Sequence, residues 1–428
     1  MSAINEHVLP NGMTLLCLQQ PHLHSISFGM YLKGGPLYEN RQNQGVCHLL
    51  EHLCFRGLGG LSHDELQERF NRFGMDMDGA TYREAMVFTL GARPRFFDDL
   101  VDLFLRFFAG TPWTQEQIDQ EKQVVLRQIE QEDPDFDDMI DLRYRKTAQG
   151  AYPCMGTAAS IEKMSAATIR RWQRLIFQPQ NACLCITGNF SDGMEQAAVE
   201  AFSELVNTTD EPPFLMQAPE GFCMRDEDSD IIRPEEDGQA KVRLHFDVDN
   251  DLVFPLVGDV LSCITGGNCD SILFQELRET EALVAEIDAS MDELGIYRRL
   301  VIDYDVRQEY LVESLEKVFA LLVRLRTYVR PSRLEHTRTQ FTENNLFELD
   351  SSLQMNDRLG WAWISEDVAR ADLDAQTAMY EDLTAEDLLN AAQAVFRPEN
   401  LVIAIQRDPA RTPRNLKPLL RRLRAMLA

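Results

Sequence analysis

The sequence predicts an α+β protein of two homologous domains, each a largely antiparallel sheet with helices packed on one face. Three observations predict this fold class: a segment that repeats half a chain later, an acidic Pro-containing stretch between the copies, and mixed strand and helix patterns within each half. The 428 residues are 44% hydrophobic, which is ample material for two packed cores.

The repeat consists of a capped helix, a turn and a buried strand. Residues Met164 to Asn189 and Leu383 to Asp408 both contain a Phe-x-Pro-x-Asn turn, and Ser165 and Thr384 are suitable N-caps. The matching positions all share one offset, 219 residues: Phe177 with Phe396, Pro179 with Pro398, Asn181 with Asn400, and Ile186 with Ile405. A fixed offset over a whole helix-turn-strand unit indicates a duplicated domain.

The boundaries follow from the repeat and from composition. We expect an N-terminal domain over residues 1–210, a linker over 211–238 and a C-terminal domain over 239–428. The linker is rich in Pro, Asp and Glu and has weak helical periodicity. Part of it could form the first strand of the second domain.

Each half contains both kinds of element. Strands around a Pro-Asn-Gly turn are expected between His7 and Leu32, and further strands at Ala85 to Leu90 and Arg243 to Val248. Helices are expected at Asp64 to Phe73, Phe96 to Phe108, Thr114 to Glu132, Leu311 to Val329, and Arg333 to Leu349.

Charge and cysteine content exclude several classes of protein. With 42 Lys and Arg against 69 Asp and Glu, the formal charge is −27, which argues against nucleic acid and anionic membranes as partners. No run approaches the ~18 apolar residues of a membrane span, and no secretory signal is visible. The nine cysteines contain no Cys-x-x-Cys pair and favour reduced thiols, so we expect a cytoplasmic protein.

The main chemical signal is His48, Glu51 and His52 in the otherwise apolar segment Val46 to Phe55. On a helix the two histidines are one turn apart and project to the same side. Two imidazoles so placed can bind one Zn²⁺ and leave positions for a third ligand and a water, from which Glu51 is suited to take a proton. The alternative is two hydrogen-bonded core histidines with an acid between them.

The order H-x-x-E-H is the inverzincin signature, and with its surroundings the chain resembles the insulinase/pitrilysin family of metallopeptidases. It is most similar to half-size members such as the mitochondrial processing peptidase subunits. The resemblance spans nearly the whole chain through LPNGMTLL, GGPLYEN, GVCHLLEHLCFRG, GATYREAMVF, IDQEKQVVLRQIEQ, FQPQNACLCITGN and GGNCDSILFQELRE. It implies half of a clamshell, in which two such halves enclose a peptide-binding chamber.

The resemblance also implies a third zinc ligand, with one departure. The family's E-x6-E pattern reads Glu121 to Gln128, so Gln128 stands where the ligating glutamate is expected and Glu121 is assigned a catalytic role. A neutral amide oxygen should bind a cation less tightly than a carboxylate does. Glu132, one turn beyond Gln128, is the alternative ligand, and Glu130 is a poorer one because it lies about 200° around the helix.

Two further family positions differ. Active relatives carry an Arg and a Tyr seven residues apart that polarise the scissile carbonyl; here Arg278 matches the Arg, but Ala285 replaces the Tyr. The family's Asn-Ala-x-Thr segment, which backs the substrate strand, reads Asp78, Gly79, Ala80 and Thr81, so the first three are expected to contact substrate.

The second copy lacks metal ligands. At the 219-residue offset His48, Glu51 and His52 correspond to Gly267, Asp270 and Ser271, which predicts one metal site per chain.

These features predict a zinc-dependent endopeptidase that cleaves peptides in a chamber formed by two chains, with Glu51 activating a zinc-bound water. The partner would be a second copy, or a different insulinase-like chain that carries the Arg/Tyr pair. The alternative is a catalytically degenerate subunit that binds peptides or scaffolds its partner. A third possibility is a non-proteolytic metal or core-complex protein of some other kind. The family includes structural subunits of respiratory complexes, but these generally lose the H-x-x-E-H set that this chain retains.

Overall fold

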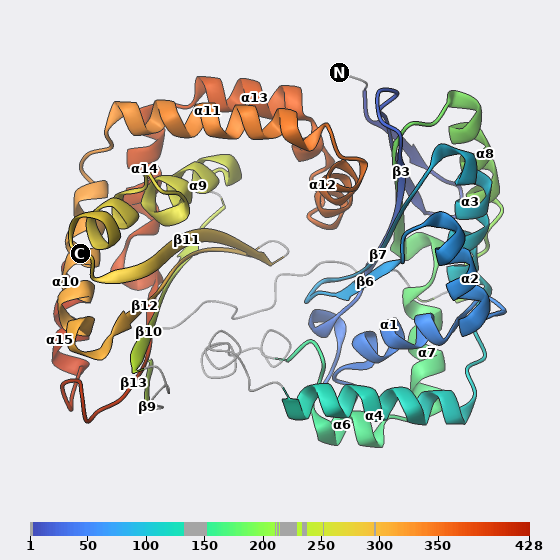
Figure 1. Ribbon diagram of the computed structural model, residues 1–428, viewed down its shortest axis with the longest axis horizontal. Helices are drawn as coiled ribbons and strands as arrows, with labels where there is room; N and C mark the ends of the chain where they lie inside the picture. Colours follow the sequence, from blue (N-terminus) through green and yellow to red (C-terminus); the bar gives the residue numbers. More distant parts are fainter. Residues whose placement is uncertain are drawn as a thin grey trace. The chain divides into compact units, whose positions relative to one another are not determined.

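The computed structural model describes residues 3–131, 152–209, 211, 214, 229–232, 238–250, 252–294 and 297–428 (Figure 1). The chain forms two compact units. The first lies within residues 1–135, 147–219 and 345–376, and the described part of the second lies within 220–344 and 377–428. Residues 345–376 therefore belong to the first unit although they follow the expected linker, and the domain bounds expected above stay a prediction.

The first unit is built on a six-stranded sheet. Its strand order is β1 (Asn5–Val8), β2 (Thr14–Gln19), β8 (Ala182–Gly188), β3 (Ile26–Lys33), β7 (Ala85–Ala92) and β6 (Asp78–Thr81). Neighbouring strands are antiparallel except for the parallel pair β2 and β8. A short hairpin, β4 (Gly57–Leu58) and β5 (Leu61–Ser62), stands apart from this sheet.

The second unit contains a five-stranded sheet that repeats the order of β2, β8, β3, β7 and β6, with no described counterpart of β1. Its order is β11 (Val284–Leu294), β12 (Tyr297–Arg307), β10 (Gln239–Val248), β13 (Leu401–Arg407) and β9 (Ser229–Ile232). Only β13 and β9 are parallel, just as only β8 and β2 are in the first sheet. Strand β9 comes from the expected linker. The common strand order confirms two homologous α+β domains with largely antiparallel sheets.

The repeated unit has the same bounds in both copies. Helix α7 (Ala166–Ile176) precedes β8, and α14 (Ala385–Val395) precedes β13, with every end displaced by the same 219 residues. Ser165 and Thr384 cap the two helices as expected. Asn181 and Asn400 each donate from Nδ2 to the last carbonyl of the preceding helix, both at 3.1 Å. This shared hydrogen bond explains why the turn requires an asparagine.

The remaining helices pack around the two sheets. In the first unit they are α1 (Val46–Arg56), α2 (His63–Phe73), α3 (Phe97–Leu105), α4 (Gln115–Gln131), α6 (Ala158–Lys163), α8 (Asp192–Ser203) and α12 (Ser352–Ile364). In the second unit, or crossing between units in sequence, they are α9 (Pro255–Ser262), α10 (Leu311–Leu325), α11 (Pro331–Glu348), α13 (Leu373–Asp382) and α15 (Lys417–Ala425). The expected helices are all present, with ends shifted by a few residues.

The first sheet is covered by helices on both faces, whereas the sequence predicted helices on one face. Every residue of β3 is buried. A strand buried on both sides needs apolar cover on both sides, because its side chains alternate between faces. Helices α3 and α8 lie on one side of β3, and α12 lies on the other (Figure 1).

Helix α12 packs unusually close to the sheet. A Cβ atom on Gly360 would lie 2.0 Å from Cζ of Tyr31, and one on Gly29 would lie 2.0 Å from Oδ1 of Asn356. Asn356 in turn donates from Nδ2 to the carbonyls of Ser27 and Cys185, at 3.1 and 2.8 Å. Because Gly360 on α12 and Gly29 on β3 have no side chains, α12 can pack against the backbone of the sheet.

Helix α1 is anchored at its N-terminus by a buried carboxylate. Glu39 is fully buried and accepts hydrogen bonds from the backbone N–H groups of Gly45 and Cys47, at 2.7 and 3.0 Å. Burial raises the pKa of Glu39 to about 7, against the opposing effect of these two donors. Gly45 has φ of 81°, and a Cβ there would lie 2.4 Å from the carbonyl oxygen of Met155. The start of α1 is thus fixed on both sides.

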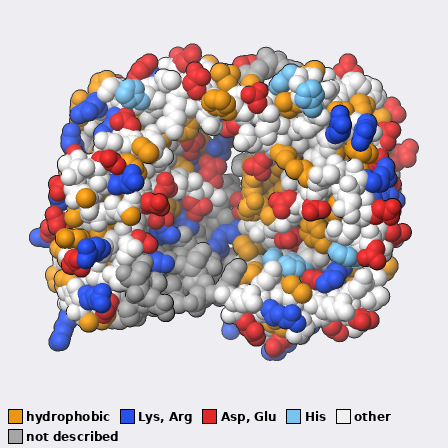
Figure 2. Space-filling view, in the orientation of Figure 1, with side chains coloured by type: hydrophobic (Ala, Val, Ile, Leu, Met, Phe, Trp, Pro, Cys, Tyr) orange, Lys and Arg blue, Asp and Glu red, His pale blue; other side chains and the backbone are white. Residues whose placement is uncertain are grey.

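On the face shown in Figure 2, acidic and basic side chains are interspersed over each unit. All eight described cysteines are free. Across the described ranges, no helix is long and apolar enough to cross a membrane.

The close approach of α12 predicts the cost of a single methyl group. Gly360→Ala should lower the free energy of unfolding by about 1–3 kcal/mol, because the added Cβ overlaps the ring of Tyr31. Gly193→Ala in α8 is the matched control, since nothing lies nearer than 3.9 Å to its Cβ position, and it should be neutral or stabilising by up to ~1 kcal/mol. Chemical denaturation of both variants measures this; equal midpoints would contradict the packing argument.

The buried Glu39 predicts a pH dependence of stability. Native Glu39 keeps its proton to a higher pH than the unfolded chain does, so its contribution to stability is present at low pH and is lost as pH rises from about 4.5 to about 7. Glu39→Gln cannot ionise. The wild type should therefore lose stability relative to this variant across that window, on the order of 3 kcal/mol in total.

Urea titrations of both proteins at a series of pH values, without metal, measure this difference. A hydrogen bond lost through the amide would shift the two profiles by a constant amount. Profiles that stay parallel from pH 4.5 to pH 8 would show that Glu39 is ionised throughout.

Candidate metal centre

Helix α1 presents its three polar residues as one cluster. Ligand atoms of His48, Glu51 and His52 all lie within 4.8 Å of one another, and the two imidazole rings are 4.6 Å apart. Their side chains are 11–16% exposed, so they are mostly shielded from water. The one-turn spacing therefore places both histidines on one side, as the sequence predicts.

Helix α4 brings Gln128 to this cluster. Its Oε1 lies 3.2 Å from Nε2 of His48. The amide oxygen thus lies beside the ring nitrogen of His48, where both atoms could bind one metal ion. Glu130 is exposed to solvent. Glu132 lies outside the described residues, and the choice between it and Gln128 stays open.

Glu121, two helical turns before Gln128 on α4, contacts the second histidine. Its Oε2 lies 3.1 Å from Nδ1 of His52, and its Oε1 accepts a hydrogen bond from Nε of Arg56. Burial disfavours the ionised carboxylate, but the hydrogen bonds from His52 and Arg56 outweigh it, so the pKa of Glu121 lies below its ordinary value. A carboxylate at Nδ1 fixes the proton there and leaves the Nε2 lone pair of His52 for a metal.

Glu51 is oriented by a residue that the sequence did not single out. Oγ1 of Thr81 donates to Oε2 of Glu51 at 2.7 Å, and Nδ1 of His48 lies 3.5 Å from the same oxygen. Thr81 closes the Asp-Gly-Ala-Thr segment, so its place in that motif was the available signal. Both contacts use Oε2, which leaves Oε1 of Glu51 for other chemistry.

Strand β6 runs along the edge of the sheet next to this cluster. It pairs with β7 on one side, and no described strand pairs with its other side. A Cβ on Gly79 would lie 2.7 Å from the ring of Phe55, so Gly79 and Thr81 face α1. Alternation then directs Asp78 and Ala80 to the opposite face, and Asp78 is exposed. The free backbone edge is what β6 offers to a peptide.

A cavity of about 350 Å³ adjoins the cluster. It is lined by Glu51, His52, Phe55, Arg56, His63 and Glu121. The sequence prediction missed Arg56 and His63. Arg56 follows His52 by one helical turn, which was a usable signal, whereas His63 reaches the cavity from the start of α2 and is hydrogen bonded at Nδ1 to the carbonyl of Phe55.

Arg278 belongs to the second unit. It lies on η7 (Phe274–Thr280), 45% exposed, with Nη1 3.0 Å from Oε1 of Glu279 and its guanidinium 4.7 Å from the ring centre of Phe274. Ala285 is exposed on β11. Their roles in the site stay predictions. In the second copy, Asp270 interacts with His336 at 3.2 Å.

One other group of metal-binding residue types occurs among the described residues: His7, Cys17 and Glu195. Nε2 of His7 lies 2.8 Å from Oε1 of Glu195, and Asn5 donates to the same carboxylate. Burial, together with nearby Glu195, raises the pKa of Cys17 well above its ordinary value. With its carboxylate already hydrogen bonded and its thiol held neutral, this group serves to join β1, β2 and α8.

The comparisons with known proteins cover most of the chain. Residues 15–154 match the family described as Insulinase (Peptidase family M16), and residues 163–341 match the Peptidase M16 inactive domain. An uncharacterized zinc protease of Bacillus subtilis is 22% identical over 83% of this chain and 87% of its own length. One from Rickettsia bellii is 22% identical over 92% of this chain and 95% of its own. The beta subunit of the mitochondrial-processing peptidase of Saccharomyces cerevisiae is 26% identical over 31% of this chain and 29% of its own.

Solved structures share the fold. A protease from Helicobacter pylori superposes with a TM-score of 0.83 at 18% identity, covering 95% of this chain and all of its own. A Pseudomonas fluorescens structure described as a peptidase M16 inactive domain reaches 0.84 at 16% identity, over 95% and 98%. With both halves matched in order and the histidine pair in place on α1, the chain belongs to the insulinase family of peptidases.

Proposed function

We propose that this chain is a zinc-dependent endopeptidase subunit whose metal is held by His48, His52 and Gln128 and whose general base is Glu51. The observation that carries the proposal is the convergence on α1 and α4 of two histidines, an amide oxygen and a carboxylate that is positioned by Thr81. The full-length relatives named as zinc proteases support the choice of metal and reaction.

The donor set fits a zinc ion. Nε2 of His48 and Oε1 of Gln128 already lie 3.2 Å apart, and Glu121 leaves Nε2 of His52 available. Two imidazoles with one oxygen ligand are a set that catalytic zinc sites use, with further positions open. Bound zinc would supply Lewis acidity, which polarises a carbonyl oxygen and makes water more acidic.

The chain's own residues then have distinct roles. Oε1 of Glu51 accepts a proton from the attacking water and later returns it to the leaving amine, while Thr81 holds Oε2. Glu121 is a positioning residue, because it acts through His52 and Arg56. An extended peptide adds to the free edge of β6, next to the cavity lined by Glu51 and Phe55.

A companion chain completes the site in this proposal. Ala285 supplies no hydroxyl where active relatives are expected to have a tyrosine, so the carbonyl-polarising pair is incomplete in this chain. The partner is either a second copy or, as the missing hydroxyl favours, a related chain with an intact Arg/Tyr pair. The chamber between two such chains and a cytoplasmic location remain parts of the proposal.

A non-hydrolytic subunit is the alternative, and Gln128 is the observation that favours it. A neutral ligand leaves more of the metal charge uncompensated than a glutamate would. Under that alternative the same β6 edge binds peptides for a catalytic partner, and the chain itself holds no zinc.

Zinc affinity should depend on the charge at position 128. Gln128→Glu adds a carboxylate where the amide oxygen lies beside His48, and it should tighten zinc binding by roughly tenfold or more. His48→Ala should abolish stoichiometric binding, and Glu51→Gln should retain zinc while lowering peptide hydrolysis by roughly 10²–10⁴-fold.

Competitive titration with a fluorescent zinc chelator gives the affinities, and elemental analysis gives the stoichiometry. Gln123→Glu, an exposed position on the same helix, is the charge-matched control and should leave affinity unchanged. A wild-type chain that binds no zinc and a Gln128→Glu variant that does bind it would support the non-hydrolytic alternative. A wild type that binds zinc as tightly as Gln128→Glu would exclude Gln128 as the third ligand.

Turnover should depend on the companion chain. Adding an insulinase-like subunit that carries the Arg/Tyr pair should raise peptide cleavage roughly 10²–10³-fold, the typical effect of an oxyanion donor. A companion whose tyrosine is changed to phenylalanine is the control and should restore little of this rate. Full activity of the purified chain alone, unchanged by any partner, would rule out this part of the proposal.

A further inference from the structure

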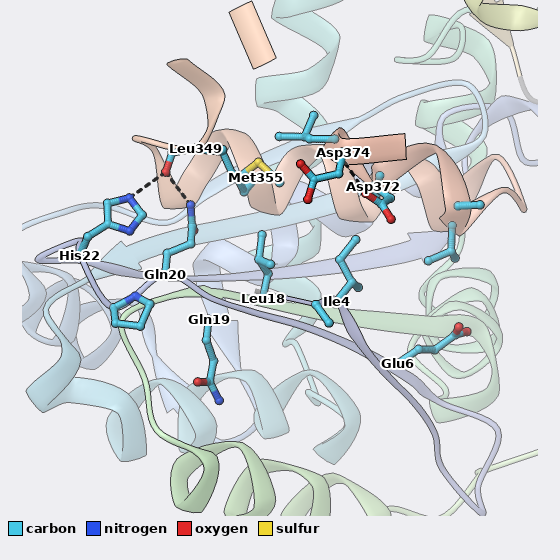
Figure 3. Close-up of a pocket in the computed structure, with 16 residues that line it drawn as sticks. Ile4, Glu6, Leu18, Gln19, Gln20, His22, Leu349, Met355, Asp372 and Asp374 are labelled. Carbon is cyan, nitrogen blue, oxygen red and sulfur yellow. Dashed lines mark hydrogen bonds between the residues drawn. The ribbon is translucent and has the colours of Figure 1, made fainter. Parts of the chain in front are cut away.

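A large cavity of the first unit, of about 740 Å³, lies away from the metal centre (Figure 3). Strands β1 and β2 and residues 349–374 line it, and Met355 places it on the α12 face of the sheet. Gln20 and His22 both contact the carbonyl of Leu349, at 2.7 and 3.3 Å, so polar groups of its lining join β2 to that segment. These contacts hold the fold together and assign no ligand to the cavity.

The smaller cavity, of about 350 Å³, is shared with the metal centre. Glu51 and His52 belong to both. Phe55 forms part of its wall, and the Cβ position of Gly79 on β6 lies 2.7 Å from that ring. The cavity therefore adjoins both the groups proposed to react and the strand proposed to hold the peptide.

Backbone pairing shows which residues of β6 face its free edge. The N–H group of Tyr82 donates to the carbonyl of Ala85 at 2.7 Å, and hydrogen-bonded and non-hydrogen-bonded pairs alternate along an antiparallel ladder. Gly79 and Thr81 therefore direct their N–H and C=O groups away from β7, toward the free edge. A peptide residue that pairs with Gly79 has its side chain on the same face of the sheet, toward α1 and Phe55.

Arg56 is the one Lys or Arg among the six residues that line this cavity. Its Nε donates to Glu121, which holds the guanidinium in place. Both oxygens of Glu121 are then occupied, one by Arg56 and the other by His52. Within the described ranges no hydrogen bond involves the two terminal amino groups of Arg56, and its side chain is 37% exposed. These amino groups remain able to donate to a ligand in the cavity.

The proposed metal ligands leave this cavity short of negative charge. Both histidines bind zinc as neutral imidazoles, and Gln128 adds a neutral amide. Arg56 balances Glu121, which leaves Glu51 as the remaining carboxylate of the lining. A relative with a glutamate as its third ligand would hold one negative charge more. A carboxylate of the substrate would therefore supply charge that Gln128 does not.

Building on the peptidase function proposed above, we propose that this cavity selects an acidic side chain of the substrate, Glu or Asp, and that Arg56 determines the selectivity. The acidic residue pairs with Gly79, and its side chain enters the cavity beside Phe55. Its carboxylate accepts hydrogen bonds from the terminal amino groups of Arg56, a geometry in which guanidinium binds carboxylates well. A lysine at the same position would meet like charge.

Peptide binding to the zinc-loaded Glu51→Gln chain tests the selectivity without turnover. The probes are four peptides, acetyl-Thr-Val-X-Val-Thr-amide, in which X is Glu, Gln, Leu or Lys. Each competes with a fluorescent copy of the Glu peptide in an anisotropy assay. The Glu peptide should bind roughly threefold to tenfold tighter than the isosteric Gln peptide, and the Lys peptide should bind least tightly.

Variants of Arg56 in the same background identify the residue responsible. Arg56→Leu should bring the Glu and Gln peptides to equal affinity while the Leu peptide binds no more weakly than before, which shows that β6 still accepts a peptide. Arg56→Lys should keep part of the preference, because it keeps the charge. Arg72→Leu is the matched control and should keep all of it, since Arg72 pairs with Asp99 outside the cavity.

Equal affinities of the Glu and Gln peptides would overturn the proposal. A preference that survives Arg56→Leu but disappears when zinc is removed would place the carboxylate on the metal, and this too would overturn it. Elemental analysis of each variant reports its zinc content separately, because Arg56 contacts Glu121. If no peptide binds, docking on β6 fails as well, whereas peptides that all bind alike remove the selectivity and leave the peptidase function standing.

Discussion

The requirement that each polar group on a mostly buried helix has a partner shapes the whole metal centre. Helix α1 packs its apolar residues into the first core, which leaves His48, Glu51 and His52 only 11–16% exposed by side chain. Groups shielded in this way are costly unless they are hydrogen bonded. Each of them has its own partner outside α1: Gln128 and Glu121 from α4, and Thr81 from β6. Desolvation therefore ties three elements together, and the same contacts that offset its cost also aim the ring nitrogens and the carboxylate at a common point.

The duplication explains much of the fold but not its division into units. Local signals sufficed for the repeat, because the N-cap, the Phe-x-Pro-x-Asn turn and the apolar strand lie within 26 consecutive residues, and the structure reproduces them with identical bounds in both copies. The position of α12 could not be read in this way. Its place on the first sheet depends on Gly360 fitting against Tyr31 and Gly29 fitting against Asn356, contacts across more than 300 residues that leave no periodic pattern.

The metal centre likewise combines residues that helical spacing places together with residues that only tertiary contacts bring there. His48 and His52 are one turn apart on a single helix, and Glu121 and Gln128 are two turns apart on another, so helical geometry alone predicts which of them share a face. Thr81 and Glu39 were not predicted to orient the site, because each contacts α1 from a segment outside that helix. Glu39 reaches the start of α1 from residues that form no regular helix or strand of their own, and its effect depends on burial, which the sequence states only indirectly. Spacing therefore predicts which candidate ligands share a helix face, whereas the hydrogen bonds made by Thr81 and Glu39 are seen only in the tertiary structure.

Charge decides how the proposed zinc site can tolerate Gln128. With two neutral imidazoles and an amide as ligands, the only carboxylates in contact with the cluster are Glu51 and Glu121, within the part of the chain that the structure describes. Glu121 transmits its charge through His52, since a histidine that donates to a carboxylate becomes a more basic ligand. Arg56 shares that carboxylate and reduces the effect. In such a site the ligands would bind the metal, and part of the compensating negative charge would come from groups beside them. Loss of the Glu121 charge should accordingly weaken metal binding more in this chain than in a relative whose third ligand is a glutamate.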